Sequence, residues 1–343
     1  MRRRIRRLGK VLITRQEIKS MNRVTYEQVV AQLKTSGCAA GRVDPTQYHA
    51  WKGRLAEELG MPVTSKSDLA DFAANRYAWK KAKEAGTRKS SAALELGSLV
   101  DCLALTPELF EEQYLCEPKR VALKKDGTPY ANGQQDATQK AEWEAAVAAG
   151  RRLLSPDEYE RGARIAGQVV RHMELIGLVV GETCDTQVGL WVCIAELGGV
   201  PLATPIILCA MLDVLPHEGR RIVDVKTTGK DVASESALVY AAEDFWYGVQ
   251  AALYTDMFNL VVEEDERCEF VFLFVGTGGE VPMSRELVML GDSLALYREV
   301  YTGWVREFAL AHADGDWGTP ELEAVVYAPS RRFNAQWAMN KEQ

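Results

Sequence analysis

Two aspartates and a lysine near the middle of the chain have the types and spacing that metal-assisted hydrolysis needs. Asp213 ends an apolar run, Asp224 follows after ten intervening residues, and Lys226 lies two positions further on. Carboxylate oxygens suit Mg²⁺, and an ammonium group beside a metal-bound water can orient that water and offset developing charge. The same spacing also fits an edge hairpin with a surface Asp–Lys pair, so the spacing alone leaves both interpretations open.

Two strands joined by a tight turn would bring these side chains together. Alternation along residues 221–226 puts Val223 and Val225 on one face of a strand and the charged Asp224 and Lys226 on the other. The intervening segment 216–220 predicts a hairpin turn. If Pro216 pairs with Arg221, Asp213 lies opposite Asp224, whereas a slip of one residue would put the two carboxylates on different faces.

The pattern along the rest of the chain predicts an α+β fold with a mixed β-sheet flanked by helices. Segments rich in Val, Ile, Leu and Phe predict strands at 187–195, 205–215, 221–226 and 269–276. Helical patterns occupy 26–33, a stretch beginning after Ser65, and 92–105, 136–149, 156–176, 236–259 and 291–312. We expect a basic arm with a short helix at 1–45, one domain at 46–320 and a tail at 321–343.

Basic residues gather in two segments that could contact phosphates. One is the helix end at 76–89, and the other is the polar segment 119–139, which predicts a long loop. The candidate DNA contacts in them are Lys80, Lys81, Arg88, Lys89, Lys124 and Lys125. A solvated helix end explains the first run equally simply.

Composition excludes several other classes of protein. The 343 residues are 47% hydrophobic and 26% charged, as in a folded chain, and 41 basic against 48 acidic residues give a net charge of −7. The seven cysteines form no CxxC pair, the four histidines form no i,i+4 pair, and neither a Walker loop nor GxGxxG is present, which argues against disulfide, zinc and nucleotide sites. No apolar run reaches the ~18 residues of a membrane span, so we expect a cytoplasmic protein with no membrane partner.

The ordered set of motifs resembles the PD-(D/E)XK nuclease superfamily and, within it, the RecE-type (exonuclease VIII-like) exonucleases of phages and prophages. The resemblance extends over residues 48–317. Its motifs are Tyr48-His49-Ala50, Thr64-Ser65-Lys66-Ser67-Asp68-Leu69, the helix 93–103, Leu212-Asp213, Val223-Asp224-Val225-Lys226-Thr227-Thr228, and the segment 247–254 with Gln250 and Tyr254.

The resemblance implies a role for each matching residue. Asp213, Asp224 and the carbonyl of Val225 would be metal ligands, and Lys226 would be the catalytic lysine. The remaining matches, in the Q-x₃-Y motif and directly after the lysine, would contact DNA; they are Gln250, Tyr254 and Thr227.

One position departs from the family pattern. Relatives have a metal-binding histidine where this chain has Asp101. Aspartate is a harder oxygen ligand that can still bind Mg²⁺, but the change could equally mark weakened activity.

The resemblance also implies an activity and partners. We expect a Mg²⁺-dependent deoxyribonuclease, with Mn²⁺ as a substitute and no iron–sulfur cluster, because only Cys268 follows Lys226. Relatives of this type resect linear duplex DNA 5′→3′ from its ends, form homo-oligomeric rings and act with a RecT-like single-strand annealing protein in phage recombination. The alternatives are an endonuclease of the same fold and a catalytically weakened DNA-binding protein.

Overall fold

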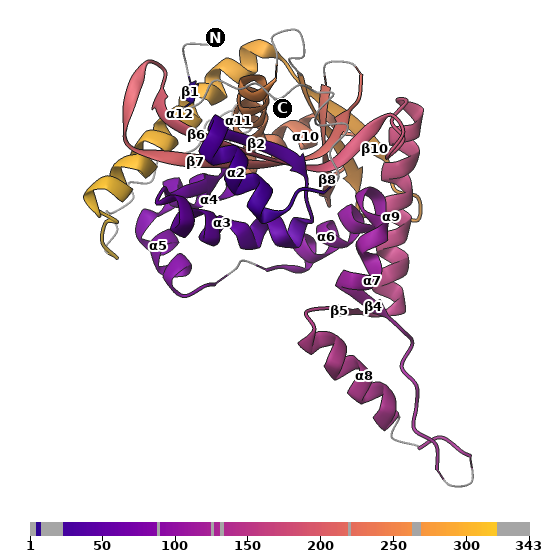
Figure 1. Ribbon diagram of the computed structural model, residues 1–343. Helices are drawn as coiled ribbons and strands as arrows, with labels where there is room; N and C mark the ends of the chain where they lie inside the picture. Colours follow the sequence, from indigo (N-terminus) through magenta and orange to yellow (C-terminus); the bar gives the residue numbers. More distant parts are fainter. Residues whose placement is uncertain are drawn as a thin grey trace, which may run out of the picture.

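A large mixed β-sheet forms the centre of the molecule (Figure 1). The computed structural model describes residues 5–7, 23–87, 90–124, 127–130, 134–218, 221–262 and 269–320. Within these ranges eight strands form one sheet in the order β1-β6-β7-β8-β9-β10, with β2 beside β6 and β3 beside β7. The strands are β1 (Ile5–Arg7), β2 (Cys38–Arg42), β3 (Val63–Ser65), β6 (Cys184–Leu197), β7 (Val200–Pro216), β8 (Arg221–Thr228), β9 (Glu269–Gly276) and β10 (Ser284–Met289).

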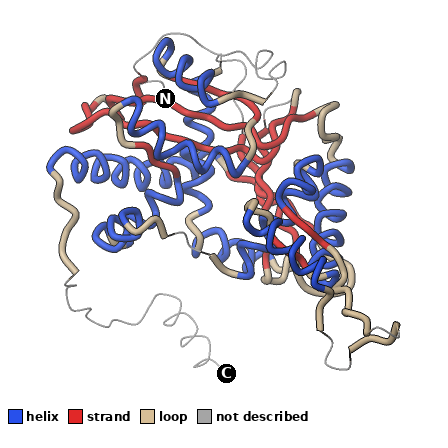
Figure 2. The backbone as a smooth tube through the Cα atoms, turned by 60° about the horizontal axis from the view of Figure 1, so that its bottom comes forward, coloured by secondary structure: helices blue, strands red, loops and turns tan. Residues whose placement is uncertain are grey.

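Helices cover both faces of this sheet, as the tube view shows (Figure 2). Strand β9 illustrates the division, because Phe270, Phe272 and Phe274 pack with α11 and α12 while the alternate residues pack with α6 and α9. Helices α4, α10, α11 and α12 share the first core, and α6 and α9 share the second. The helices are α2 (Tyr26–Ser36), α3 (Pro45–Leu59), α4 (Lys66–Ala74), α5 (Arg76–Glu84), α6 (Ala92–Leu105), α9 (Pro156–Leu175), α10 (Glu235–Asp244), α11 (Tyr247–Val261) and α12 (Gly291–Asp314).

Strand connections are antiparallel in the first half of the sheet and parallel where helices intervene. Strands β6, β7 and β8 form an antiparallel meander, and β9 then pairs parallel to β8 after the crossover through α10 and α11. Strand β10 returns antiparallel to β9, as the Gly-rich turn at 276–279 predicts.

One edge of β7 is shared by two strands. Residues 207–209 of β7 pair with β6 on one side, so their parallel partner β3 must lie on the other side. Strand β8 occupies that same side further along, where Val214 pairs with Val223. Strands β3 and β8 therefore form a fork along β7, and Asp213 lies in it, between the two pairings.

A smaller unit projects from the body of the molecule between α6 and α9. It consists of η1 (Pro107–Leu109), α7 (Phe110–Gln113), β4 (Tyr114–Cys116), α8 (Ala137–Ala148) and β5 (Arg152–Leu154). Strands β4 and β5 pair in parallel at its base, and the loop between β4 and α8 extends furthest from the sheet (Figures 1 and 2).

The helices and strands expected from sequence periodicity are present, with two of the long helices divided. The helix that begins after Ser65 ends at Ala74, because Asn75 adopts an extended backbone and caps α5 by accepting from the N–H of Ala78. The stretch at 236–259 is divided at Trp246, whose left-handed backbone (φ 54°) separates α10 from α11.

The structure differs from the expected division at residue 45. Thr25 caps α2 with a capping box, as the sequence predicts, but α2 and the following β2 belong to the sheet and its core rather than to a separate arm. The small residues at 38–41 form a strand because Cys38, Ala39 and Ala40 are buried against β6. Residues 1–4 and 8–22 of the expected arm, and the expected tail at 321–343, lie outside the described residues.

Across the described residues, no helix combines the length and the apolarity that crossing a membrane requires.

Candidate active site

The fork along β7 gathers the charged residues that the sequence singles out. The register that pairs Val214 with Val223, continued by one residue, puts Asp213 opposite Asp224, as the hairpin predicts. Asp213 Oδ2 accepts a hydrogen bond of 2.9 Å from the backbone N–H of Val225. In a regular β7–β8 ladder, a backbone carbonyl of β7 would accept the hydrogen bond from the N–H of Val225. Here the side-chain carboxylate of Asp213 accepts it instead.

Asp224 is enclosed by two polar partners on the face that α11 covers. Its side chain is 2% exposed, its Oδ1 accepts a 2.6 Å hydrogen bond from Gln250 Nε2, and its Oδ2 forms an ion pair with the ammonium of Lys226. Lys226 Nζ also lies 5.1 Å from the ring centroid of Tyr247. Burying charges is tolerated here because each has a partner.

Helix α6 contributes the third carboxylate. Asp101 is half-buried, and its electrostatic coupling to Asp213, Asp224 and Lys226 places it beside them. Gly97, one turn earlier, lies against β8: a Cβ added there would be 3.4 Å from Thr227 Oγ1. Helix α6 therefore packs close to β8 one turn before Asp101.

Burial and mutual repulsion make this cluster reluctant to carry its full negative charge. Burial raises the pKa of Asp101 to about 7, with Asp224 adding to the rise and Lys226 opposing it. Burial likewise raises the pKa of Asp213 well above its usual range, and Asp224 and Asp101 raise it further. Burial alone would lower the pKa of Lys226, but Asp224 and Asp213 outweigh burial and hold it above the usual value. A nearby positive charge favours the ionised form of each of these carboxyl groups.

A second lysine, which the chemical argument from sequence did not single out, borders the cluster. Lys66 begins α4 directly after β3, and its ammonium donates a 2.6 Å hydrogen bond to the carbonyl of Phe245 at the break between α10 and α11. Burial, together with the nearby charge of Lys226, lowers the pKa of Lys66 to about 8. Lys66 lies at the fork because it follows β3, which pairs with β7. In the sequence, only the motif Thr64-Ser65-Lys66 indicated this residue.

The two residues of the Q-x₃-Y motif face the cluster from α11. Gln250 holds Asp224 directly, and burial raises the pKa of Tyr254, an effect that Asp224 reinforces. Next to this motif on α11, Val249, Leu253 and Met257 are fully buried, whereas Phe245 is 57% exposed because it lies outside α11 at the break.

The expected basic contacts lie elsewhere. Lys80 and Lys81 both pair with Glu84 on the surface of α5, and Lys80 Nζ lies 4.7 Å from the ring centroid of Trp317. Lys124 is exposed in the loop of the projecting unit, away from the fork (Figure 1). Arg88, Lys89 and Lys125 lie outside the described residues.

Oxygen ligands fit the chemistry of Mg²⁺, although they are not gathered as a ready-made site. Among the residues that the structure describes, no three His, Cys, Asp or Glu side chains converge as a metal-binding group. Asp224 is turned toward Lys226 and Gln250, and Asp213 toward Val225 N–H. A divalent cation would therefore compete with these internal partners for the carboxylate oxygens.

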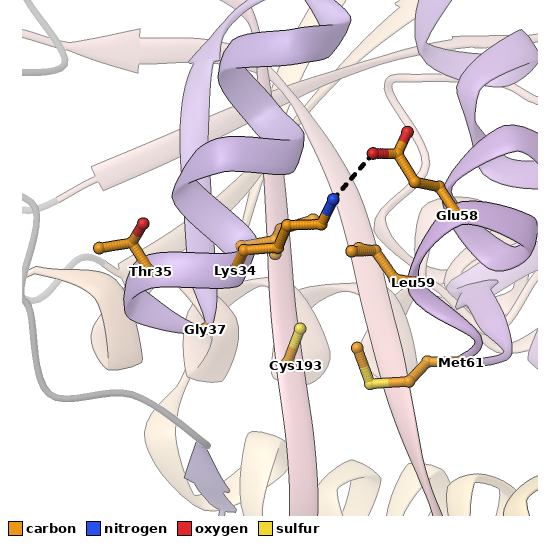
Figure 3. Close-up of a pocket in the computed structure, with 8 residues that line it drawn as sticks. Lys34, Thr35, Gly37, Glu58, Leu59, Met61 and Cys193 are labelled. Carbon is orange, nitrogen blue, oxygen red and sulfur yellow. Dashed lines mark hydrogen bonds and ion pairs between the residues drawn. The ribbon is translucent and has the colours of Figure 1, made fainter.

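A pocket of about 380 Å³ lies outside the fork, between α2, α3 and β6 (Figure 3). Lys34 and Glu58 form an ion pair of 2.9 Å at its wall, and Cys193 lines its floor. Burial raises the pKa of the Cys193 thiol to about 11, so this sulfur stays protonated and is a poor nucleophile. The pocket offers no group suited to hydrolysis.

Comparisons with known proteins give only distant likenesses. No family model matches the chain, and no curated protein matches it. Among solved structures, a chain from Eubacterium rectale described as a "putative exonuclease" has 14% identity and a TM-score of 0.49, with 86% of this chain and 98% of that chain covered. The crystal structure of SSO0001 has 12% identity and a TM-score of 0.26, with 49% and 66% covered. The function is therefore argued from the geometry of the fork.

Proposed function

We propose that this protein is a metal-dependent deoxyribonuclease that hydrolyses phosphodiester bonds at the fork. The observation that carries the proposal is the pairing at the fork: Asp213 accepts a hydrogen bond from the N–H of Val225, and the neighbouring, buried Asp224 pairs with Lys226. A hairpin with a simple surface ion pair would not explain a buried Asp224 and two half-buried carboxyl groups whose pKa values are raised.

The order of the surrounding elements supports a PD-(D/E)XK core. A helix (α6), an antiparallel meander (β6, β7, β8), a crossover helix (α11) and a parallel strand (β9) follow one another, with the three charged motifs on α6, β7 and β8. This arrangement agrees with the family that the sequence motifs resemble.

In the proposed reaction, the carboxylates of Asp213 and Asp224, the carbonyl of Val225 and the side chain of Asp101 would hold Mg²⁺, and Mn²⁺ would serve as a substitute. The ion would lower the pKa of a bound water and neutralise the phosphate. Lys226 orients the attacking water and offsets charge in the transition state, and Tyr247 restricts its ammonium to the fork. Gln250 fixes the orientation of Asp224, and Tyr254 and Thr227 border the path of the DNA strand.

The finer points of the proposal follow the sequence resemblance. We propose 5′→3′ digestion of linear double-stranded DNA from its ends, during recombination of a phage or prophage in the cytoplasm of a bacterial host. A homo-oligomeric ring would enclose the DNA, and a RecT-like protein would anneal the exposed strand.

Labelled linear DNA tests the activity and its direction together. Duplex DNA carrying a 5′ or a 3′ label is incubated with Mg²⁺ or with EDTA, using the parent protein, Asp224→Asn, and Asp157→Asn as an exposed control in the first turn of α9. We expect Mg²⁺-dependent release of 5′ nucleotides by the parent and the control. Loss of one catalytic carboxylate should reduce the rate by at least about 100-fold.

Two other results would redirect the proposal. Cutting of a covalently closed circle would identify an endonuclease, since an exonuclease needs an end. No digestion with either Mg²⁺ or Mn²⁺, together with retained binding of duplex DNA, would mean a catalytically weakened binding protein, as the replacement of histidine by Asp101 allows. Calorimetric titration with Mn²⁺ would then show whether the carboxylates still bind a cation.

A further inference from the structure

Gln187, in β6 beside the fork, has two energetically unfavourable features, one in its backbone and one in its side chain. Its backbone is left-handed (φ 52°); among the described residues other than glycine, only Trp246 shares this property. Its side chain is 3% exposed, and its Oε1 is buried without a hydrogen-bond partner. Such outliers persist only where the surrounding structure imposes them, and they gather at functional sites.

At this residue the paired strands β6 and β7 turn over, so that side chains which would face one helix layer face the other. On one side of it, Val188 and Leu212 are register partners, and both belong to the core covered by α11 and α12. On the other side, Thr186 and Val214 are register partners, and Val214 packs in the opposite core with α6 and α9.

The hydroxyl of Thr186 confirms the reversal on its own strand. It donates a 2.6 Å hydrogen bond to the carbonyl of Leu105, at the end of α6. In a regular strand, residues two apart face the same side. Both strands therefore turn over between these two pairs, and the positions that remain at the turning point are Gln187 and Asp213.

This reversal explains the direction of the Asp213 carboxylate. At the turning point a side chain leaves the strand near the plane of the sheet, toward the neighbouring strand. Asp213 Oδ2 lies 2.9 Å from the backbone nitrogen of Val225 in β8, which is an in-plane contact. Without the reversal, alternation would direct this carboxylate to one of the two helix-covered faces.

We propose that Gln187 is a positioning residue whose left-handed backbone turns β6 and β7 over and so aims Asp213 into the fork. Its importance for catalysis rests on the proposed function, whereas its effect on Asp213 does not. The essential property is the backbone conformation, not the amide.

Substitutions at 187 separate backbone from side chain. Gln187→Gly removes the amide but adopts a left-handed backbone freely, and Gln187→Asn keeps an amide and tolerates that backbone. Gln187→Val disfavours it strongly because valine is β-branched. If circular dichroism shows that the valine variant does not fold, Gln187→Ala is compared with Gln187→Gly instead. Alanine disfavours the left-handed backbone less strongly than valine does.

The readout independent of activity is hydrogen exchange at the amide of Val225, measured by mass spectrometry without metal. We expect this amide to exchange about tenfold faster in Gln187→Val than in the parent, because its carboxylate acceptor is displaced. The glycine and asparagine variants should keep its protection. Nuclease activity should fall on the order of 100-fold in the valine variant alone.

The outcomes distinguish the two proposals. Unchanged protection of Val225 in both the valine and alanine variants would overturn the positioning role. So would equal losses in the glycine and valine variants, since the amide rather than the backbone would then be essential. If Val225 behaves as expected but the parent digests no DNA, the proposed nuclease function fails while the structural role of Gln187 stands.

Discussion

At the scale of single residues, the fork shows how three carboxylates are kept in one place against their repulsion. Asp213 is satisfied by a backbone N–H, and Asp224 by an amide and an ammonium, so each has a specific partner. For Asp101, burial raises the pKa to about 7 although the charge of Lys226 opposes the rise. The protein thus tolerates an unfavourable charge that a bound cation would relieve.

The raised pKa of Asp101 predicts that this residue lowers the free energy of unfolding more at high pH than at low pH. Its pKa is higher in the folded state than the usual 3.8, so the folded protein binds more protons between these values, and its stability falls as the pH rises from about 4 to about 7. Asp101→Asn should remove this loss. We expect the variant to exceed the metal-free parent in free energy of unfolding by roughly 1–3 kcal/mol at pH 8, and to approach it below pH 4.

Urea denaturation in EDTA across this pH range measures the difference. Asp157→Asn, on an exposed turn of α9, is the control and should show no such trend. A constant difference between Asp101→Asn and the parent at every pH would contradict the expectation.

At the scale of elements, helices α11 and α12 must hold the Gln250 side of the site against the sheet. A buried group between them consists of Asp256, Arg298 and Tyr301: Arg298 Nε donates to both carboxylate oxygens at 3.0 and 2.8 Å, and the Tyr301 hydroxyl donates at 2.7 Å. Nearby, Gly248 lies against the ring of Tyr297, which a Cβ would strike. The two helices therefore pack closely at both ends of the motif that carries Gln250.

Removing one partner of the buried Arg298–Asp256 ion pair should lower the free energy of unfolding more than removing both partners. Arg298→Leu leaves Asp256 charged and buried with only the tyrosine hydroxyl, and should lower the free energy of unfolding by about 3–5 kcal/mol. The double variant Arg298→Leu/Asp256→Leu removes both charges and should recover much of this loss. Urea denaturation of the two variants tests it, and equal losses would show that packing rather than charge dominates.

The sequence was most informative about regular elements and the hairpin. Alternation at 221–226 predicted that Asp224 and Lys226 share a face, but the sequence left two registers open for Asp213. The pairing of Val214 with Val223 has the register in which Asp213 lies opposite Asp224. The place of β3 and of Lys66 was not predictable in this way, since three residues carry too little periodicity to show which strand they join. Gln187 was equally hidden, because nothing in the residue type indicates a left-handed backbone.

At the scale of the whole molecule, the projecting unit differs from the sheet and its helices. In the described part of its loop between β4 and α8, isolated bridges such as Val121 with Gln135 join the two arms, and Lys119, Arg120 and Lys124 are exposed. Segments with few buried contacts open at little cost in free energy. The loop therefore depends little on the rest of the fold.

Limited proteolysis should detect this difference. Within residues 23–320, we expect trypsin to cut first in the stretch 119–125, and the two fragments to remain associated with unchanged circular dichroism. Replacing the basic residues of that stretch with glutamine should delay this first cut at least tenfold, since trypsin needs a cleavable side chain and opening elsewhere costs more. Prior cleavage within β6–β9 would contradict the expectation. The replaced residues are Lys119, Arg120, Lys124 and Lys125.

The parallel pairing of β8 with β9 has a consequence for synthesis of the chain. Every charged residue of the fork has been synthesised once Lys226 has been made, yet β8 lacks its neighbour until residues 269–276 follow. Contacts between segments far apart in sequence form late, because the connecting loop must close first. The nascent chain therefore contains every charged residue of the fork before it can hold them together, and a product truncated before Glu269 should lack the assembled fork.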